Sequence, residues 1–282
     1  MTTPPTIALI LSLGLNNAWG EGNGTNSGVR YVKAPRFARP LVEKWISEYA
    51  KTQPGVEFQI AKGQKGQDDI DLSVVLENKE SDRNTKDFSH TIVYFGETAV
   101  LPITARSSEA ARLLEGKHLN AKKLKHLFFL NDDFDEDVKK IKAFENIIIY
   151  SGSNATSVAT SFAHNFGEEA ANFRGKRISG DDLFLNTALT KDPLGVSFNA
   201  LPNIFDLQSR HIKESLTIIG DFNHTTLDEL LTTLESGKVK EVTIEKVGIS
   251  APHADEEVNK FLDWVVAQGT KYNHEFGLLN LK

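Results

Sequence analysis

A run of small hydroxyl and amide side chains separates an apolar segment, residues 146–150, from residues 158–166, whose spacing predicts a helix. The first N–H groups of a helix are unpaired, and the helix dipole adds about half a positive charge there. Hydroxyl and amide groups can also donate to oxygen atoms. The run is therefore a candidate oxyanion site with the donors Ser151, Ser153, Asn154, Thr156 and Ser157. An ordinary strand-to-helix turn with a Ser or Thr cap fits the same residues, so both interpretations stay open.

Two other loops could bring positive charge to a ligand. Arg36 stands in a turn directly before residues 39–50, which have helical apolar spacing and begin with Pro40. Lys65 lies in Lys62-Gly-Gln-Lys-Gly66, where the glycines permit close backbone approach. Taken singly, a solvated arginine and a plain hairpin turn are the simpler interpretations of these two loops. The second loop lacks the spacing of a P-loop.

Other chemistry has little support in the sequence. The chain contains no cysteine, which excludes thiol catalysis, thiolate metal sites and disulfides. Its eight histidines stand singly, without metal-ligand spacing, and no Gly-x-Ser-x-Gly sequence occurs. The acidic residues 132–137 lack the glycine turn and closing glutamate of a calcium loop, so a solvated face is expected there. We therefore expect no enzyme activity, no metal and no cofactor.

The N-terminal residues predict export. Residues 1–28 combine a short apolar run, Ile7 to Leu15, with small residues before Gly20 and a Gly-, Asn- and Ser-rich stretch. This resembles a secretory signal peptide followed by a leader, although no Lys or Arg precedes Arg30. A buried first strand or a cloning remnant are the alternatives. The formal charge of −6 gives no general attraction to nucleic acid.

The elements that must position these loops alternate in type, which predicts an α/β fold. The expected strands are residues 29–33, 56–60, 71–76, 91–95, 99–103, 146–150, 195–198, 216–219 and 242–247. The expected helices are residues 39–50, 107–114, 120–129, 158–166, 226–234 and 255–268. Asp181 and Asp182 are expected to begin a further helix, and Pro102 to stand at a sheet edge or crossover. Trp45 and Trp264 lie on apolar helix stripes and are expected in the core.

Several short motifs occur in an order typical of one family. They are Arg39-Pro-Leu-Val-Glu-Lys-Trp-Ile-Ser-Glu-Tyr49, Ala99-Val-Leu-Pro-Ile103, the Ser151 to Ser157 loop, Asp192-Pro-Leu-Gly-Val-Ser-Phe198, Phe261-Leu-Asp-Trp-Val-Val-Ala-Gln-Gly269 and Glu275-Phe-Gly-Leu-Leu279. In this order the chain resembles the periplasmic phosphate-binding proteins of bacterial ABC importers (PstS-like). The resemblance covers about residues 29–282.

The resemblance implies a two-lobed periplasmic-binding-protein-like fold of the second type, each lobe a mixed sheet flanked by helices. Residues 29–103 with 218–282 would form lobe one, residues 104–217 lobe two, and hinge strands would cross near Pro102 to Thr104 and at Thr217-Ile218. The ligand would lie between the lobes at helix N-termini, held by the Phe37 amide, Thr156, Ser157 and the loop amides. The implied function is non-enzymatic capture of phosphate or a related oxyanion for a membrane permease, by a periplasmic protein that is expected to be a monomer.

The chain departs from the family at three places. Arg36 and Phe37 stand where the family has a hydroxyl residue and a backbone donor, Tyr150 stands where an arginine is expected, and Leu76 replaces the acid that accepts a proton from the bound anion. Arg36 or Lys65 would have to replace the missing positive charge. The alternative is a binding-protein fold that holds a different organic ligand or an envelope protein partner. An enzyme built on the same fold is a third possibility.

Overall fold

The computed structural model describes residues 28–62, 69–77, 91–129, 142–153, 157–220, 226–237, 239, 242–252 and 254–282. The expected leader, the loop that contains Lys65, the acidic run and Asn154 to Thr156 all lie outside these described residues. Within them, one mixed sheet is flanked by helices, which confirms the expected α/β class.

Nine strands of the described residues form this sheet in the order β2-β1-β3-β9-β4-β7-β5-β6, and β8 pairs with β4 outside that path. The strands are β1 (Arg30–Lys33), β2 (Phe58–Ile60), β3 (Leu72–Leu76), β4 (Thr91–Ala105), β5 (Ile148–Gly152), β6 (Lys176–Ile178), β7 (Gly195–Ala200), β8 (Leu216–Ile218) and β9 (Thr243–Ala251). β1 runs parallel to β2 and β3, and β5 runs parallel to β6 and β7. The pairs that join these two groups through β9 and β4 are antiparallel.

The α-helices of the described residues are α1 (Arg39–Thr52), α3 (Glu109–Leu114), α4 (Ala121–Phe128), α5 (Lys142–Glu145), α6 (Ala159–Asn165), α7 (Leu183–Lys191), α8 (Leu201–Ile204), α9 (Leu227–Glu235) and α10 (Glu256–Trp264). Four of them begin at a side-chain cap, because Ser108, Asn120, Thr226 and Asp255 each accept a hydrogen bond from the N–H three residues further on. α10 ends at Trp264, four residues before the expected end, and the chain continues as a π-helical turn. The sequence analysis did not predict β6, α5 or α8.

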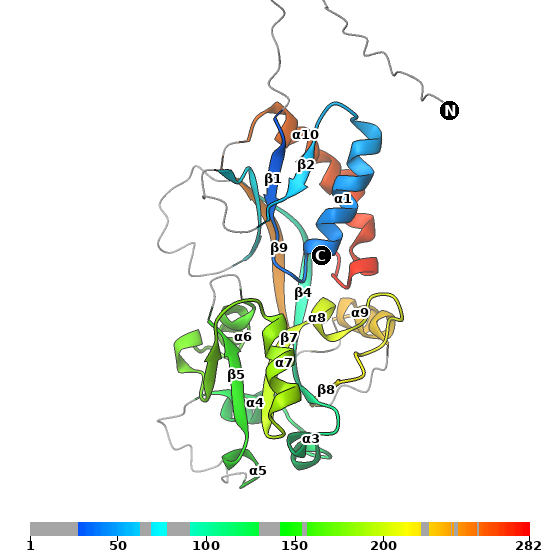
Figure 1. Cartoon of the computed structure of the whole chain (residues 1–282). Coiled ribbons are helices and arrows are strands. Elements are labelled where there is room, and N and C mark those ends of the chain that lie inside the picture. The colour runs from blue at the N-terminus through cyan, green and yellow to red at the C-terminus, as the bar shows by residue number, and fades with distance from the viewer. Residues whose placement is uncertain are drawn as a thin grey trace, which may run out of the picture.

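Figure 1 shows two groups of elements joined by long strands. α1, α10, β1 and β2 lie together at one end, and α3, α4, α7 and β5 lie together at the other, while β4 runs through both (Figure 1). Residues 91–95 and 99–103 were expected as two strands, and this expectation is wrong. β9 pairs with β4 from Thr91 to Val100 across a bulge between Tyr94 and Gly96, so the two segments stay in one strand.

Pro102 lies where β4 changes its neighbour. β9 pairs with β4 up to Val100, and β8 pairs with it from Ile103, while Pro102 uses its carbonyl to accept the Ile219 N–H. Proline has no N–H to donate, and this change of partners is a position where the ladder tolerates it. The two segments expected as hinges are paired with each other, since Ile103 is opposite Ile218 and Thr104 is opposite Thr217.

The core confirms the expected burial of both tryptophans. Trp45 is completely buried and donates from Nε1 to the Gly269 carbonyl at 2.8 Å, and Trp264 is 9% exposed. Beneath α6, the Phe162 and Phe198 rings stack with centroids 4.2 Å apart. The boundaries of the two lobes stay a prediction. The leucines of α9, which belong to the expected lobe one, share a buried cluster with residues of α8 in the expected lobe two.

Among the described residues, no helix has both the length and the apolar character that crossing a membrane requires.

Candidate ligand-binding site

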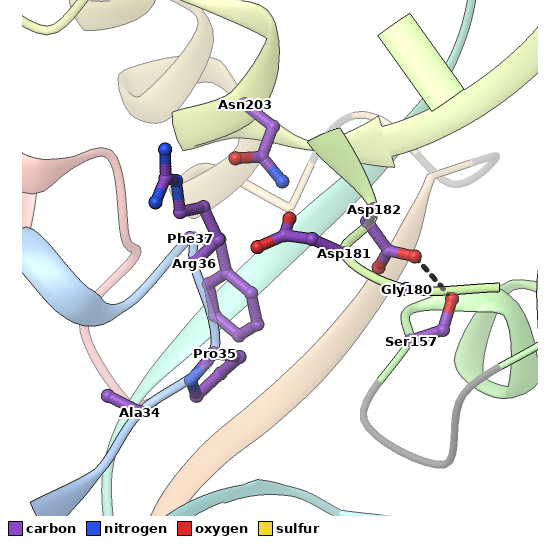
Figure 2. A pocket seen from close by; sticks show the side chains of 9 residues that line it. All are labelled: Ala34, Pro35, Arg36, Phe37, Ser157, Gly180, Asp181, Asp182 and Asn203. Carbon is purple, nitrogen blue, oxygen red and sulfur yellow. Dashed lines mark hydrogen bonds between the residues drawn. The ribbon is translucent and has the colours of Figure 1, made fainter. Parts of the chain in front are cut away.

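A pocket of about 250 Å³ opens between the turn before α1 and three segments from the other end of the molecule. Its lining residues are Ala34, Pro35, Arg36, Phe37, Ser157, Gly180, Asp181, Asp182 and Asn203. Figure 2 shows residues 34–37 on one side of the pocket, Ser157 and residues 180–182 on the other, and Asn203 above them. We call residues 34–37 the α1 wall. Ser157, residues 180–182 and Asn203 form the α7 wall.

The α1 wall offers hydrogen-bond donors. The Pro35 carbonyl accepts the N–H groups of Ala38 and Arg39 at 3.1 and 3.0 Å, which closes the turn and starts α1. The Phe37 side chain is 3% exposed and anchors this turn in the core. By contrast, the backbone N–H groups of Arg36 and Phe37 donate to no atom of the described residues, and the Arg36 guanidinium forms no ion pair with them. The residues that line this side of the pocket therefore carry one full positive charge and two free N–H groups beside a helix N-terminus.

The α7 wall contains two carboxylates. Asp181 accepts the Leu183 N–H at 2.9 Å and so begins α7, as the sequence predicted. Asp182 does not cap α7. Its carboxylate accepts the Ser157 hydroxyl at 2.6 Å and the Val158 N–H at 3.0 Å, both at the start of α6.

Burial is the main influence on Asp182. Loss of solvent raises the pKa of its carboxyl group, while the bonds from Ser157 and Val158 act in the opposite direction. The α6 start is thus satisfied by an acid of the same chain. The resemblance had led us to expect an external anion there.

Gly152 makes room for this arrangement at the end of β5. A Cβ atom at position 152 would lie 2.6 Å from the Asp182 carboxylate and still closer to the Ser157 hydroxyl oxygen. Any side chain there would push apart the Ser157–Asp182 hydrogen bond. Glycine at position 152 therefore allows the end of β5 to approach Ser157 and Asp182 closely.

Three buried asparagines fix the rest of the α7 wall. The Ala200 N–H donates to Asn199 Oδ1 at 2.9 Å, which identifies that atom as the oxygen of the amide. Asn203 Nδ2 donates to the same oxygen at 2.8 Å, and Asn199 Nδ2 donates to the Asp182 carbonyl at 2.9 Å. Asn186 Nδ2 completes the network with a 2.8 Å bond to the Asn203 carbonyl. Asn203 Oδ1 is consequently the atom left over, and no described residue donates to it.

A second cation lies behind Asn203. Lys213 Nζ donates to the Asn203 carbonyl at 2.8 Å. Burial lowers the pKa of Lys213, the nearby Asp206 raises it, and the positive charge of Arg36 lowers it again. Arg36 lines the pocket, and Lys213 bonds to the backbone of a lining residue.

This architecture also occurs in known structures. A putative phosphate ABC transporter substrate-binding protein from Clostridium perfringens, with bound phosphate, matches with a TM-score of 0.64 at 12% identity over 90% of this chain and 100% of that one. An ABC-type phosphate transport receptor from Vibrio cholerae matches with a TM-score of 0.58 at 10% identity, over 90% and 100% of the two chains. The fold is that of the periplasmic binding proteins. No family model matches the sequence, and no curated protein is similar to it in sequence.

Within this periplasmic-binding-protein fold, three of the predicted ligand-binding residues come together. Arg36, Phe37 and Ser157 line the pocket, although Ser157 already gives its proton to Asp182. Ser151 is 1% exposed, and its hydroxyl has no hydrogen-bond partner in the described part of the chain. Ser153 is exposed beside the end of β6, where it bonds to Ile178 and Ser179. Neither of these two serines is among the residues that line the pocket. Lys65, Asn154 and Thr156 lie outside the described residues.

Two of the three departures from the family have local explanations. Tyr150 is not among the lining residues and donates its hydroxyl to Asp192 at 2.7 Å, with Lys176 3.4 Å from the same oxygen. Leu76 packs against the buried core. The sequence analysis missed Asp181, Asp182 and Asn203 as pocket residues. The adjacent aspartates were visible, but their local signal is that of a helix start.

Proposed function

We propose that the chain is a non-enzymatic solute-binding protein that captures a small molecule with an oxyanionic group in the pocket between the α1 and α7 walls. Phosphate is the simplest such group. The observation that carries the proposal is the unpaired Arg36 guanidinium, which faces the pocket together with the free N–H groups of Arg36 and Phe37. A guanidinium binds two oxygens of a phosphate, phosphonate or carboxylate group at once.

A binding role also agrees with the chemistry of the lining. Ser157 is the lining residue with a nucleophilic hydroxyl, and that hydroxyl bonds to Asp182 while its oxygen accepts the Ala159 N–H. Asp182 in turn accepts the Val158 N–H at the start of α6, so both Ser157 and Asp182 stabilise the local structure. Residues from both groups of elements line the pocket, and two-lobed proteins usually bind their ligands between the lobes.

We further propose that the protein is exported to the periplasm and passes its ligand to an ABC-type permease. Support for this comes from the resemblance of the leader to a signal peptide and from the similarity in fold to ABC transporter binding proteins. Detection of the chain in a periplasmic extract, shortened at its N-terminus, would be the expected result. Retention of the full-length chain in the cytoplasm would contradict export.

Calorimetric titration of the full chain with phosphate, arsenate, sulfate, short carboxylates and short phosphonates tests the binding role. We expect saturable binding of at least one of them, weakened by Arg36→Ala about 10-fold to 100-fold, the value of one charge-assisted hydrogen bond. Lys191→Ala is the control, because Lys191 is exposed at the end of α7 and forms no ion pair with a described residue. Equal affinities of Arg36→Ala and the unchanged chain, or no binding of any compound, would contradict the proposal.

A further inference from the structure

The two walls of the pocket differ in charge. The α1 wall contributes the Arg36 guanidinium. The α7 wall contributes the carboxylates of Asp181 and Asp182 and the amide oxygen Asn203 Oδ1. Both walls also hold backbone N–H groups that donate to no described residue, those of Arg36 and Phe37 on one side and of Asp181 and Asp182 on the other. Figure 2 shows the Asp181 carboxylate directed into the space between the walls. A ligand that fills this space can therefore place an acid group against one wall and an ammonium group against the other.

The acceptor character of Asn203 does not depend on a choice of amide orientation. Asn199 Oδ1 is fixed as an acceptor by the Ala200 N–H, so the Asn203 atom bonded to it is a nitrogen. Asn203 is 4% exposed and yet lines the pocket, which leaves its Oδ1 toward the ligand. This oxygen has no donor among the described residues, and a ligand N–H would supply one.

The pocket lining carries charges of both signs. Arg36 contributes a positive charge and Asp181 and Asp182 contribute two negative ones, while Lys213 bonds to the Asn203 carbonyl outside the lining. A fully ionised oxyanion would lie against Arg36 but would also face the two carboxylates, and like charges at close range oppose binding. A ligand with no net charge and one charge at each end fits the same pocket without this repulsion.

We propose that the ligand is a small zwitterion, with its acid group against the Arg36 guanidinium and the Phe37 N–H and its ammonium group against Asp181 and Asn203 Oδ1. The proposal rests on the solute-binding function above and specifies its substrate class. The pocket volume of about 250 Å³ is below the usual range for drug-sized ligands, roughly 300–1,000 Å³. This volume is large enough for an amino acid or aminophosphonate with a short carbon chain.

Matched compounds that differ only in the ammonium group provide the test. Calorimetric titration of the full chain at pH 7 would compare β-alanine with propionate, and 2-aminoethylphosphonate with ethylphosphonate, with inorganic phosphate and sulfate alongside. We expect at least one amino compound to bind more than 10-fold more tightly than its partner without the ammonium group. Equal or weaker binding of both amino compounds would overturn the proposal.

Two variants locate the preference in the α7 wall. Asp181→Asn keeps an oxygen for the Leu183 N–H and removes the charge. It should reduce the ratio of affinities between the amino compound and its partner by about 10-fold, while the affinity for the simple anion stays equal or rises. Asp263→Asn is the control, since Asp263 is exposed on α10 and has no ion pair with a described residue. An unchanged ratio in Asp181→Asn would overturn the proposal.

The outcomes also separate this proposal from the solute-binding function. Tight binding of phosphate that exceeds that of both amino compounds would leave the binding function in place and refute the zwitterion. Absence of binding by all six compounds would refute both.

Discussion

Gly152→Ala tests directly how the α7 wall is built. Gly152 ends β5, and its backbone conformation is open to any residue, so the substitution acts only through the added methyl group. That methyl would lie 2.6 Å from Asp182 Oδ1, 3.0 Å from Ser157 Cβ and still closer to the Ser157 hydroxyl oxygen. The serine must rotate away, or the strand end must move away from α6.

Either response destabilises the fold. Overpacking by a single methyl group costs about 1–3 kcal/mol. Rotation of Ser157 would give up a hydrogen bond to a charged group, which is worth about 1.5–3 kcal/mol. Replacement of glycine by alanine also lowers the conformational entropy of the unfolded chain, and this effect stabilises the fold by about 0.4–1 kcal/mol. We therefore expect a net loss of about 1–3 kcal/mol, which lowers the melting temperature by roughly 2–4 °C for each kcal/mol in a chain of this size.

Urea unfolding and thermal melting measure this loss. Gly55→Ala is the matched control, because no atom lies within 4 Å of its added methyl group, and its stability should change by less than about 1 kcal/mol. In a Ser157→Ala background, the cost of Gly152→Ala should fall, since the nearest atom has gone. If Gly152→Ala melts at the same temperature as Gly55→Ala, the close approach of Gly152, Ser157 and Asp182 is refuted.

Two further predictions concern a buried charge and a buried hydrogen bond. Burial raises the pKa of Asp182 in the folded chain above its ordinary 3.8. At a pH between the pKa of the unfolded chain and that of the folded chain, the folded chain holds a proton that the unfolded chain has lost. The free energy of unfolding therefore falls as the pH rises through this window. Asp182→Asn should remove this slope, and urea titrations across the window that show the same slope in both proteins would contradict the raised pKa. Trp45→Phe should cost about 1–3 kcal/mol more than Trp264→Phe, because Trp45 Nε1 bonds to the Gly269 carbonyl whereas Trp264 Nε1 has no partner among the described residues. Equal losses in urea unfolding would contradict the role of that bond.

Much of the fold could be predicted because its signals are local. The helices expected at residues 39–50, 120–129 and 226–234 agree with α1, α4 and α9 within two residues at each end. The signals failed where the determining contact is distant. Gly96 looks like a break between two strands, yet pairing with β9 carries β4 through a bulge there. Helix α8 has four residues and begins after a strand without a gap, which leaves too few positions for periodicity.

Among the residues of the site, those that carry a charge or precede a helix could be predicted from the sequence. Arg36 and Phe37 were expected at the start of α1 and do line the pocket, since a turn before a long helix places its residues at the helix end. Asn203 was not predicted as a site residue, because the sequence around an asparagine does not show that it belongs to a buried hydrogen-bond network. That network depends on Asn186 and Asn199 and on a backbone N–H, which meet through tertiary structure.

The Ser157 and Asp182 pair explains why the ligand class could not be derived from the loop sequence. A hydroxyl-rich turn before a helix favours any carboxylate or phosphate oxygen that can reach it, whether that oxygen belongs to a ligand or to the chain itself. Asp182, 25 residues away, reaches it, and Gly152 leaves the space. Once an internal carboxylate holds this position, the wall that resembled an anion site becomes a source of negative charge. The Arg36 guanidinium lies on the opposite wall of the pocket. Under the proposal above, the ligand is selected by two walls of opposite charge, with its acid group against Arg36 and its ammonium group against Asp181.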